Sequence, residues 1–195
     1  MFQLEEHYWW FVGRRYIVAQ LLRHNARLPA QARILDIGCG SGGNIPTLQM
    51  FGNALGVDIS LQALNYCQQR RHCSLANARA NQLPIKDGVI DLATMLDVLE
   101  HIEDDRNALR EIWRTLKPSG QLLLTVPAYP SLWSEHDEAL HHQRRYRFHE
   151  LKEKVRDAGF RVVWMSYAIA AVIAPFISFA GCSACARVSE NRRPR

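Results

Sequence analysis

The chain alternates short apolar runs with longer segments in which apolar residues recur every three or four positions. Short apolar runs bounded by Gly, Asp or Pro are typical of buried strands, whereas the longer spacing indicates amphipathic helices. The segments expected to form strands are 34–36, 54–58, 90–95, 121–126 and 160–167. The segments expected to be helical are 47–51, 61–71, 106–116 and 148–158, with one or two helices in 1–24. This alternation predicts a doubly wound, mostly parallel α/β sheet in which 160–167 is an antiparallel edge strand.

A glycine-rich turn follows the first of these strands, in the string ILDIGCGSGGN at 34–44. Glycine lets the backbone turn sharply and lets a ligand approach without obstruction by a Cβ atom. The next helix is expected to start near 43–46, with its unpaired N–H groups facing the ligand. A strand, a glycine turn and a helix start together predict a pocket of the nucleotide-binding type.

Two cofactor classes compete for this pocket. Gly38, Gly40 and Gly43 satisfy the G-x-G-x-x-G pattern of dinucleotide sites, and Asp58 ends the next strand at the spacing of a ribose-binding acid. Asp36, however, puts a carboxylate on the pocket floor, where a pyrophosphate would have to lie. A carboxylate there repels phosphate and suits a ligand with an ammonium group, so an NAD-dependent oxidoreductase is the disfavoured alternative.

Four strings in order, LDIGCGSG, GVDIS, IDLATMLDVLEHIED and LKPSGQLLLTVP, closely resemble the class I S-adenosylmethionine-dependent methyltransferases. The resemblance covers roughly Ile34 to Phe160. The strings HYWWFVGRR and PAYPSLWSEHDEALHHQRRYR resemble one bacterial small-molecule branch of that superfamily. The implied cofactor is S-adenosyl-L-methionine, with S-adenosyl-L-homocysteine as its product. It carries a sulfonium and an amino acid head but no phosphate, which agrees with the argument from Asp36.

The expected cofactor-binding residues lie at the ends of three strands. Asp58 is expected to accept both ribose hydroxyls, although it could instead cap the next helix, a task that Ser60 could also perform. Ile59 would contact the adenine face, and Leu96 and Asp97 would hold the methionine part. The full expected set is Asp36, Gly38, Cys39, Gly40, Gly42, Asp58, Ile59, Leu96 and Asp97.

The segment DVLEH at 97–101 is the expected chemical centre. Asp97, Glu100 and His101 can share one helical face, and a histidine beside the methyl donor can act as general base on a hydroxyl. His101 is therefore the predicted catalytic residue. Two alternatives stay open: a structural pair at a helix start, and a site like the E-x-x-E-H magnesium ligands of some O-methyltransferases. The prediction assigns no metal ligand.

Substrate contacts are expected from the first helix and from the long polar segment 128–147. Clustered aromatic and basic side chains at the carboxyl edge of a sheet suit an acceptor with carboxylate, phosphate or lipid headgroup character. A solvated surface helix would explain the same charges. The predicted substrate residues are Tyr8, Trp9, Trp133, His136, His141 and Arg145.

Two departures from the family pattern bear on activity. Many class I methyltransferases have an adenine-binding acid shortly before the LP pair, but this chain reads ANARANQLP, with Arg79 in that region. After Gly181 the sequence shows no strand pattern, so we expect the sheet to lack its usual last strand and to expose the edge of strand 121–126. Such an edge would favour a homodimer. A cofactor-binding relative with little activity therefore remains an alternative to an enzyme.

Length and composition fit one domain, at 195 residues and 48% hydrophobic content. The expected parts are lid helices at 1–30, a cofactor-binding core at 31–127, a substrate-side insertion at 128–147, a last helix, edge strand and apolar segment at 148–181, and a basic tail at 182–195. The net charge of +5 is concentrated in a few basic clusters, which argues against a nucleic-acid groove reader. Five scattered cysteines indicate a reducing, cytoplasmic location.

The stretch 162–186 contains no charged residue. A strand followed by a buried helix explains it, and so would peripheral membrane contact aided by the basic tail. The sequence as a whole predicts methyl transfer from S-adenosyl-L-methionine to a small-molecule acceptor, with a hydroxyl oxygen favoured. A membrane-associated interaction protein is the remaining alternative.

Overall fold

A single seven-stranded sheet organises the computed structural model, which describes residues 8–70, 74–167 and 183–190. The strand order is β3-β2-β1-β4-β5-β7-β6, and the strands from β3 to β5 run parallel, while β7 is antiparallel to both its neighbours. The strands are β1 (Ala32–Ile37), β2 (Gly52–Asp58), β3 (Ser74–Asn77), β4 (Ile90–Leu96), β5 (Leu116–Pro127), β6 (Phe160–Tyr167) and β7 (Ser183–Glu190).

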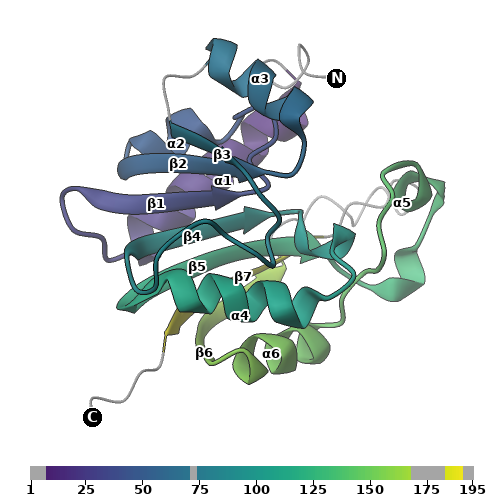
Figure 1. Ribbon diagram of the computed structural model, residues 1–195. Coiled ribbons are helices and arrows are strands. Elements are labelled where there is room, and N and C mark those ends of the chain that lie inside the picture. The colour runs from purple at the N-terminus through teal and green to yellow at the C-terminus, as the bar shows by residue number, and fades with distance from the viewer. Residues whose placement is uncertain (1–7, 71–73, 168–182, 191–195) are drawn as a thin grey trace.

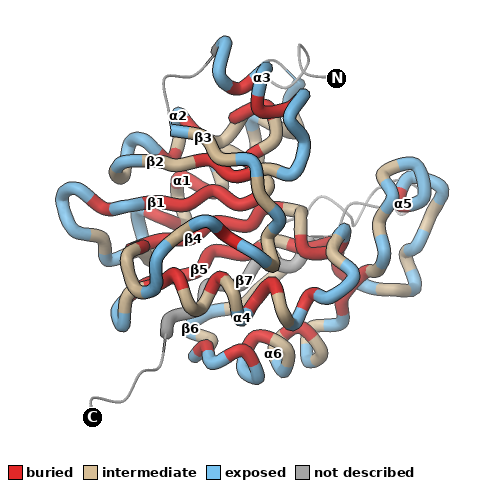
Figure 2. The backbone as a smooth tube through the Cα atoms, viewed as in Figure 1, coloured by how far each residue is buried: buried red, intermediate tan, exposed pale blue. Residues whose placement is uncertain are grey.

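Helices cover both faces of this sheet (Figure 1). Successive strand residues point to opposite faces, so Leu35 and Ile37 pack toward α4 and α6, whereas Ile34 packs with α1 and α2. Both faces are apolar, and the central strands are buried along most of their length (Figure 2). The predicted doubly wound α/β fold is confirmed. The helices are α1 (Trp9–Asn25), α2 (Ile45–Gln49), α3 (Leu61–Arg70), α4 (Asp105–Thr115), α5 (Glu135–Ala139) and α6 (Phe148–Asp157), with short 3-10 turns η1 (Leu99–His101) and η2 (Pro130–Leu132).

The expected absence of the last strand is wrong. Strand β7 lies between β5 and β6, paired with β5 from Gln121↔Ser189 to Pro127↔Ser183. The segment SACARVSE is built largely of small and polar residues with weak strand propensity, so its own sequence gives little sign of a strand. Pairing with two neighbouring strands overrides that weak propensity. Strand β5 therefore has a partner on each side, which removes the exposed edge on which the homodimer was argued.

Two smaller differences concern strand limits. Strand β3 was not expected, and β5 starts at Leu116 instead of at the predicted position 121. Leu116 pairs with Ile90, and the register shifts between Ile90 and Leu92. The Lys-Pro-Ser-Gly segment at 117–120 therefore forms an irregular start of β5.

The membrane contact predicted from the sequence involves segments that lie partly outside the described residues. Within the described parts of the chain, no helix is both long enough and apolar enough to cross a bilayer. Residues 168–182 of the apolar segment and 191–195 of the basic tail lie outside the described residues. The remainder of the expected tail, 183–190, is strand β7.

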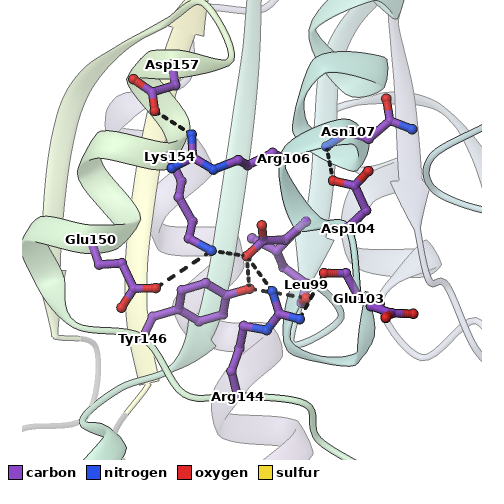
Figure 3. A network of polar contacts seen from close by, with 11 residues as sticks. Leu99, Glu103, Asp104, Arg106, Asn107, Arg144, Tyr146, Glu150, Lys154 and Asp157 are labelled. Atoms are coloured by element: carbon purple, nitrogen blue, oxygen red, sulfur yellow. Dashed lines mark hydrogen bonds and ion pairs between the residues drawn. The ribbon is translucent and has the colours of Figure 1, made fainter.

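A buried carboxylate, Asp105, joins the substrate-side insertion to the core. It accepts hydrogen bonds from Tyr146 Oη at 2.9 Å, Lys154 Nζ at 2.6 Å and Arg144 Nη1 at 3.1 Å. These three side chains converge from the end of the insertion and from α6 (Figure 3). The Tyr146 hydroxyl also lies 3.3 Å from the Leu99 carbonyl oxygen, so the same network positions η1.

The ionised form of Asp105 is the one that this network stabilises. Burial raises the pKa of Asp105, but the hydrogen bonds from Lys154 and Tyr146 outweigh it, so the pKa lies below its ordinary value of 3.8. The resulting stability is present above that value and is lost as the pH falls through the lower folded-state pKa.

We expect Asp105→Asn to lower the free energy of unfolding by about 3 kcal/mol at pH 7, because it leaves buried donors without their anionic partner. Urea denaturation measures this change. Asp157→Asn is the matched control, since it breaks an ion pair with Arg106 whose side chains are 48% and 54% exposed, and it should change the free energy of unfolding far less. Equal losses in the two variants would contradict a buried role for Asp105.

Candidate active site

The glycine turn follows β1 at the carboxyl edge of the sheet. Gly38, Gly40 and Gly42 have φ angles of 71°, 55° and 81°, a region that favours glycine. The amides of Gly38 and Cys39 both donate to the Val57 carbonyl oxygen, at 2.7 and 3.1 Å. A Cβ at Gly38 would lie 2.4 Å from a Val98 methyl. The turn is therefore held between the ends of β2 and β4, and Gly38 has no room for a side chain.

Asp58, at the end of β2, is bonded to this turn. Its Oδ2 accepts from the Gly40 amide at 2.8 Å, and its Oδ1 accepts from the Ser60 amide at 2.8 Å. Ser60 Oγ in turn accepts from the Ala63 amide at 3.2 Å and caps α3. The cap is thus the serine, and each Asp58 oxygen keeps acceptor capacity for a hydroxyl.

Asn77, at the end of β3, fixes the backbone around Asp58. Its side-chain amide donates to the carbonyl oxygens of Asp58 and Ile59, at 2.9 and 2.8 Å. The Ile59 side chain is 62% exposed beside this acid, so it is available to an adenine ring. The sequence alone does not reveal these bonds of Asn77, because they depend on the pairing of β2 with β3.

Asp36 is buried beside the glycine turn. Its Oδ1 accepts from the Thr94 hydroxyl at 2.7 Å, and its Oδ2 finds no hydrogen-bond partner among the described residues. Burial raises the pKa of Asp36 to about 7; the Thr94 bond lowers it, nearby Asp58 raises it and nearby Arg14 lowers it. A buried oxygen without a donor is a place for a cationic group of a ligand.

Asp97 follows β4 with a φ of 55°, and its side chain is tightly held. Oδ1 accepts from the Thr125 hydroxyl at 2.7 Å, and Oδ2 pairs with Arg14 Nη2 at 2.7 Å. Arg14 lies on α1, so the ion pair ties that helix to the strand ends. Leu96, immediately before, is largely buried. Nothing in the sequence singles out Arg14, which is one of several arginines in its helix.

Glu100, His101 and His142 come together beyond Asp97. Glu100 is fully buried, and neither carboxylate oxygen has a partner within the described structure. Burial, then repulsion by Asp97, raises the pKa of Glu100 well above its ordinary value. The rings of His101 and His142 meet edge to face with centroids 4.7 Å apart. Partial desolvation and the neighbouring His142 lower the pKa of His101. The sequence had indicated Glu100 and His101 as neighbours, with His101 as the catalytic residue, but nothing in it placed His142 beside them.

Asp137 on α5 holds this part of the insertion in place. It pairs with His142 Nδ1 at 2.8 Å and accepts from Arg145 Nε and Nη2, both at 2.8 Å. Burial raises the pKa of Asp137, but the bonds from Arg145 and His142 outweigh it and hold that pKa far below its usual range. Arg145 is itself buried, and its guanidinium is engaged by Asp137 inside the insertion.

The other predicted substrate residues are exposed. Figure 1 shows α5 at the side of the molecule toward which the arrowheads of β1 and β4 point. Trp133 donates to Glu138 at 3.4 Å, and Tyr8 and Trp9 stand at the start of α1, the helix that supplies Arg14. The exposed members of the predicted substrate set are Tyr8, Trp9, Trp133, His136 and His141.

Comparison with known proteins agrees with this geometry. A family model described as "Methyltransferase domain" matches residues 35–124. A Mycolicibacterium smegmatis protein named "Probable S-adenosylmethionine-dependent methyltransferase/" is 29% identical over 167 residues, which are 81% of this chain and 61% of that protein. The chain is thus similar in sequence and in fold to the class I S-adenosylmethionine-dependent methyltransferases. It spans about half the length of the curated relatives it matches.

Solved structures show the same methyltransferase fold. Geranyl diphosphate C-methyltransferase from Streptomyces coelicolor A3(2), solved with Mg²⁺, geranyl diphosphate and S-adenosyl-L-homocysteine, has a TM-score of 0.78 at 13% identity, covering 93% of this chain and 82% of that one. A protein from Haloferax volcanii, solved in complex with the Trm112 methyltransferase activator, has a TM-score of 0.76 at 19% identity, covering 92% of each chain.

The residues at the carboxyl edge fit the cofactor of this methyltransferase family. Asp58 offers acceptors to a diol, the turn leaves open backbone where a Cβ at Gly40 would meet nothing, and the unpartnered oxygen of Asp36 suits an ammonium group. A depression of about 780 Å³ lies at the opposite edge, lined by residues such as Gln31, Gly52 and Asn53. Ligands of open parallel sheets bind outside the carboxyl ends, so that depression is not the cofactor site.

We expect the affinity for S-adenosyl-L-homocysteine to fall about tenfold between pH 8 and pH 6, because protonation of Asp36 near pH 7 removes the charge that attracts the ligand's ammonium group. Calorimetric titration across this range measures the effect. Asp36→Asn should bind the ligand weakly, and its affinity should not change with pH near pH 7.

Thr94→Val is the matched control for this dependence of affinity on pH. Removal of the hydrogen bond that lowers the pKa of Asp36 should move the change in affinity to higher pH without abolishing it. If the affinity changed with pH equally in wild type and in Asp36→Asn, another group would be responsible for the pH dependence.

Proposed function

We propose that this chain binds S-adenosyl-L-methionine and transfers its methyl group to a small-molecule acceptor, with a hydroxyl oxygen as the favoured atom. The observation that carries the proposal is the set of carboxylates around the glycine turn. Asp36 and Asp58 leave acceptor capacity directed at a cationic, diol-bearing ligand, and they disfavour one that carries phosphate at this position.

Each part of the pocket has a proposed role in holding the cofactor. Asp58 would accept the ribose hydroxyls, Ile59 would cover the adenine, and Asp36, Leu96 and Asp97 would hold the methionine part. Gly38, Cys39, Gly40 and Gly42 form the turn that lets the ligand approach. When bound, the cofactor supplies a methyl group on a positively charged sulfur.

The chain's own contribution to the reaction is proposed to be alignment and proton transfer. Holding acceptor and donor in line removes much of the entropic barrier to displacement. His101 is exposed and follows Asp97 by four positions, beyond the carboxyl end of β4. We assign it to receive the proton of the acceptor hydroxyl.

The acceptor is proposed to bind against the insertion. The exposed side chains of Trp133, His136 and His141 offer an aromatic surface and imidazoles for an acidic or amphipathic acceptor. Tyr8 and Trp9 would cover the site from α1, which Arg14 ties to Asp97. Arg145 would act by holding Asp137, and through it the insertion, next to the acceptor.

A cofactor-binding relative without efficient turnover is the second candidate. One of the two arguments for it has fallen, because β7 completes the sheet. The other remains, since Arg79 stands in the region where many members have an adenine-binding acid. Product formation from labelled S-adenosyl-L-methionine and a panel of hydroxylated acceptors separates the two.

We expect His101→Gln to lower kcat by about 10²- to 10⁴-fold with an accepted substrate, because the proton acceptor is lost, while the Kd for S-adenosyl-L-homocysteine stays the same. His149→Gln is the control, since it changes an exposed histidine on α6 and should leave kcat unchanged. A kcat for His101→Gln within twofold of wild type would contradict the assignment. No product from any acceptor by a chain that binds the cofactor would favour the binding-only relative.

A further inference from the structure

We infer that Glu100, His101 and His142 form a binding site for a divalent transition-metal ion of the zinc class. One ligand atom from each of the three residues lies within 4.8 Å of the others. The residues come from η1 and from the segment that follows α5, so only the folded insertion brings them together. The cation site itself is independent of the proposed methyl transfer, and only its effect on turnover rests on that proposal.

The buried carboxylate of Glu100 favours a bound cation. Its side chain is 0% exposed, and neither carboxylate oxygen meets a donor in the described part of the chain. A buried polar group without a partner costs several kcal/mol, and an ionised one costs more. The backbone around it is fixed, because the Gln143 amide donates to the Glu100 carbonyl oxygen at 2.8 Å. A bound cation would compensate this carboxylate directly.

His142 is oriented as a metal ligand would be. Its Nδ1 is paired with Asp137 at 2.8 Å, which directs Nε2 to serve as the ligand atom. A carboxylate that orients a metal-binding imidazole in this way is a common outer-shell partner. Asp137 is fixed in turn by Arg145 and by the Ser134 amide, which donates to its Oδ2 at 2.9 Å. Asp137 is therefore the proposed positioning residue of the site.

The donor set selects the class of ion. Two imidazoles and one carboxylate suit zinc and its neighbours, whereas magnesium prefers oxygen ligands alone. Asp97, the first member of the D-x-x-E-H pattern, is not part of the cluster, because its carboxylate is engaged by Arg14 and Thr125. Ligand atoms on one tetrahedral zinc stand roughly 3.4 Å apart. Bringing the ligand atoms from within 4.8 Å to this separation requires a rotation of the His101 side chain, which is exposed.

The cation and the acceptor's proton would compete for one imidazole. His101 cannot bind a metal and accept a proton through the same lone pair, so the ion-bound form is expected to turn over slowly. The site would make methyl transfer sensitive to zinc-class ions.

The test is titration of the full chain, without cofactor or acceptor, with Zn²⁺ and with Co²⁺ as a spectroscopic probe. We expect one ion per chain with a Kd of about 1 µM or tighter, and visible Co²⁺ absorption bands typical of low coordination. Glu100→Gln and His142→Ala should each weaken binding by at least about 100-fold, and Asp137→Asn by about 10- to 100-fold. Glu100→Gln keeps the shape of the side chain, so that variant is expected to fold as wild type does.

His136→Ala is the matched control, because this histidine is exposed on α5 and lies outside the cluster, so its variant should bind the ion as wild type does. Zn²⁺ affinity equal to wild type in Glu100→Gln, or Mg²⁺ binding as tight as Zn²⁺, would overturn the proposed site. If bound Zn²⁺ raises the rate of methyl transfer, the cation site stands and the proton-acceptor role of His101 falls.

Discussion

The parallel direction of β1, β2 and β4 is the constraint on which the site depends. Because these strands run the same way, their carboxyl ends meet at one edge, and each ends next to an aspartate: Asp36, Asp58 and Asp97. Grouping carboxylates there is unfavourable: burial raises the pKa of Asp36, and the nearby Asp58 raises it further. The chain offsets this with hydroxyls from Thr94 and Thr125 and with the guanidinium of Arg14 on α1. The negative character that remains is what a cationic cofactor requires.

The two halves of the site are held by different physical means. On the cofactor side, backbone conformation dominates: glycines with positive φ pass between strand ends where a side chain at Gly38 would clash. On the side proposed to bind the acceptor, buried charge dominates. Asp105 and Asp137 each form ion pairs with basic side chains from 142–154, and these ion pairs hold the insertion against η1. The acceptor side therefore depends on ion pairs that a change of one carboxylate can break.

Much of the cofactor half could be predicted from the sequence, because it rests on local signals. An apolar run, spaced glycines and Asp58 at the next strand end are visible without knowledge of tertiary contacts, and the choice of Ser60 as helix cap was among the alternatives. The acceptor half could not be predicted in the same way. Which of the basic residues in HHQRRY would be buried against Asp137 or Asp105, and which exposed, depends on the path of the insertion. Strand β7 was missed because pairing, and not its own composition, makes it a strand.

The most direct test of the account is a calorimetric titration of the wild-type chain with S-adenosyl-L-homocysteine and, separately, with NADH, repeated for Asp58→Asn. The carboxylate edge predicts micromolar binding of S-adenosyl-L-homocysteine, no measurable binding of NADH, and a loss of at least about tenfold in affinity for the variant, because a charged acceptor of the ribose hydroxyls is lost. Binding of NADH in place of S-adenosyl-L-homocysteine, or binding of neither ligand by the folded chain, would contradict it.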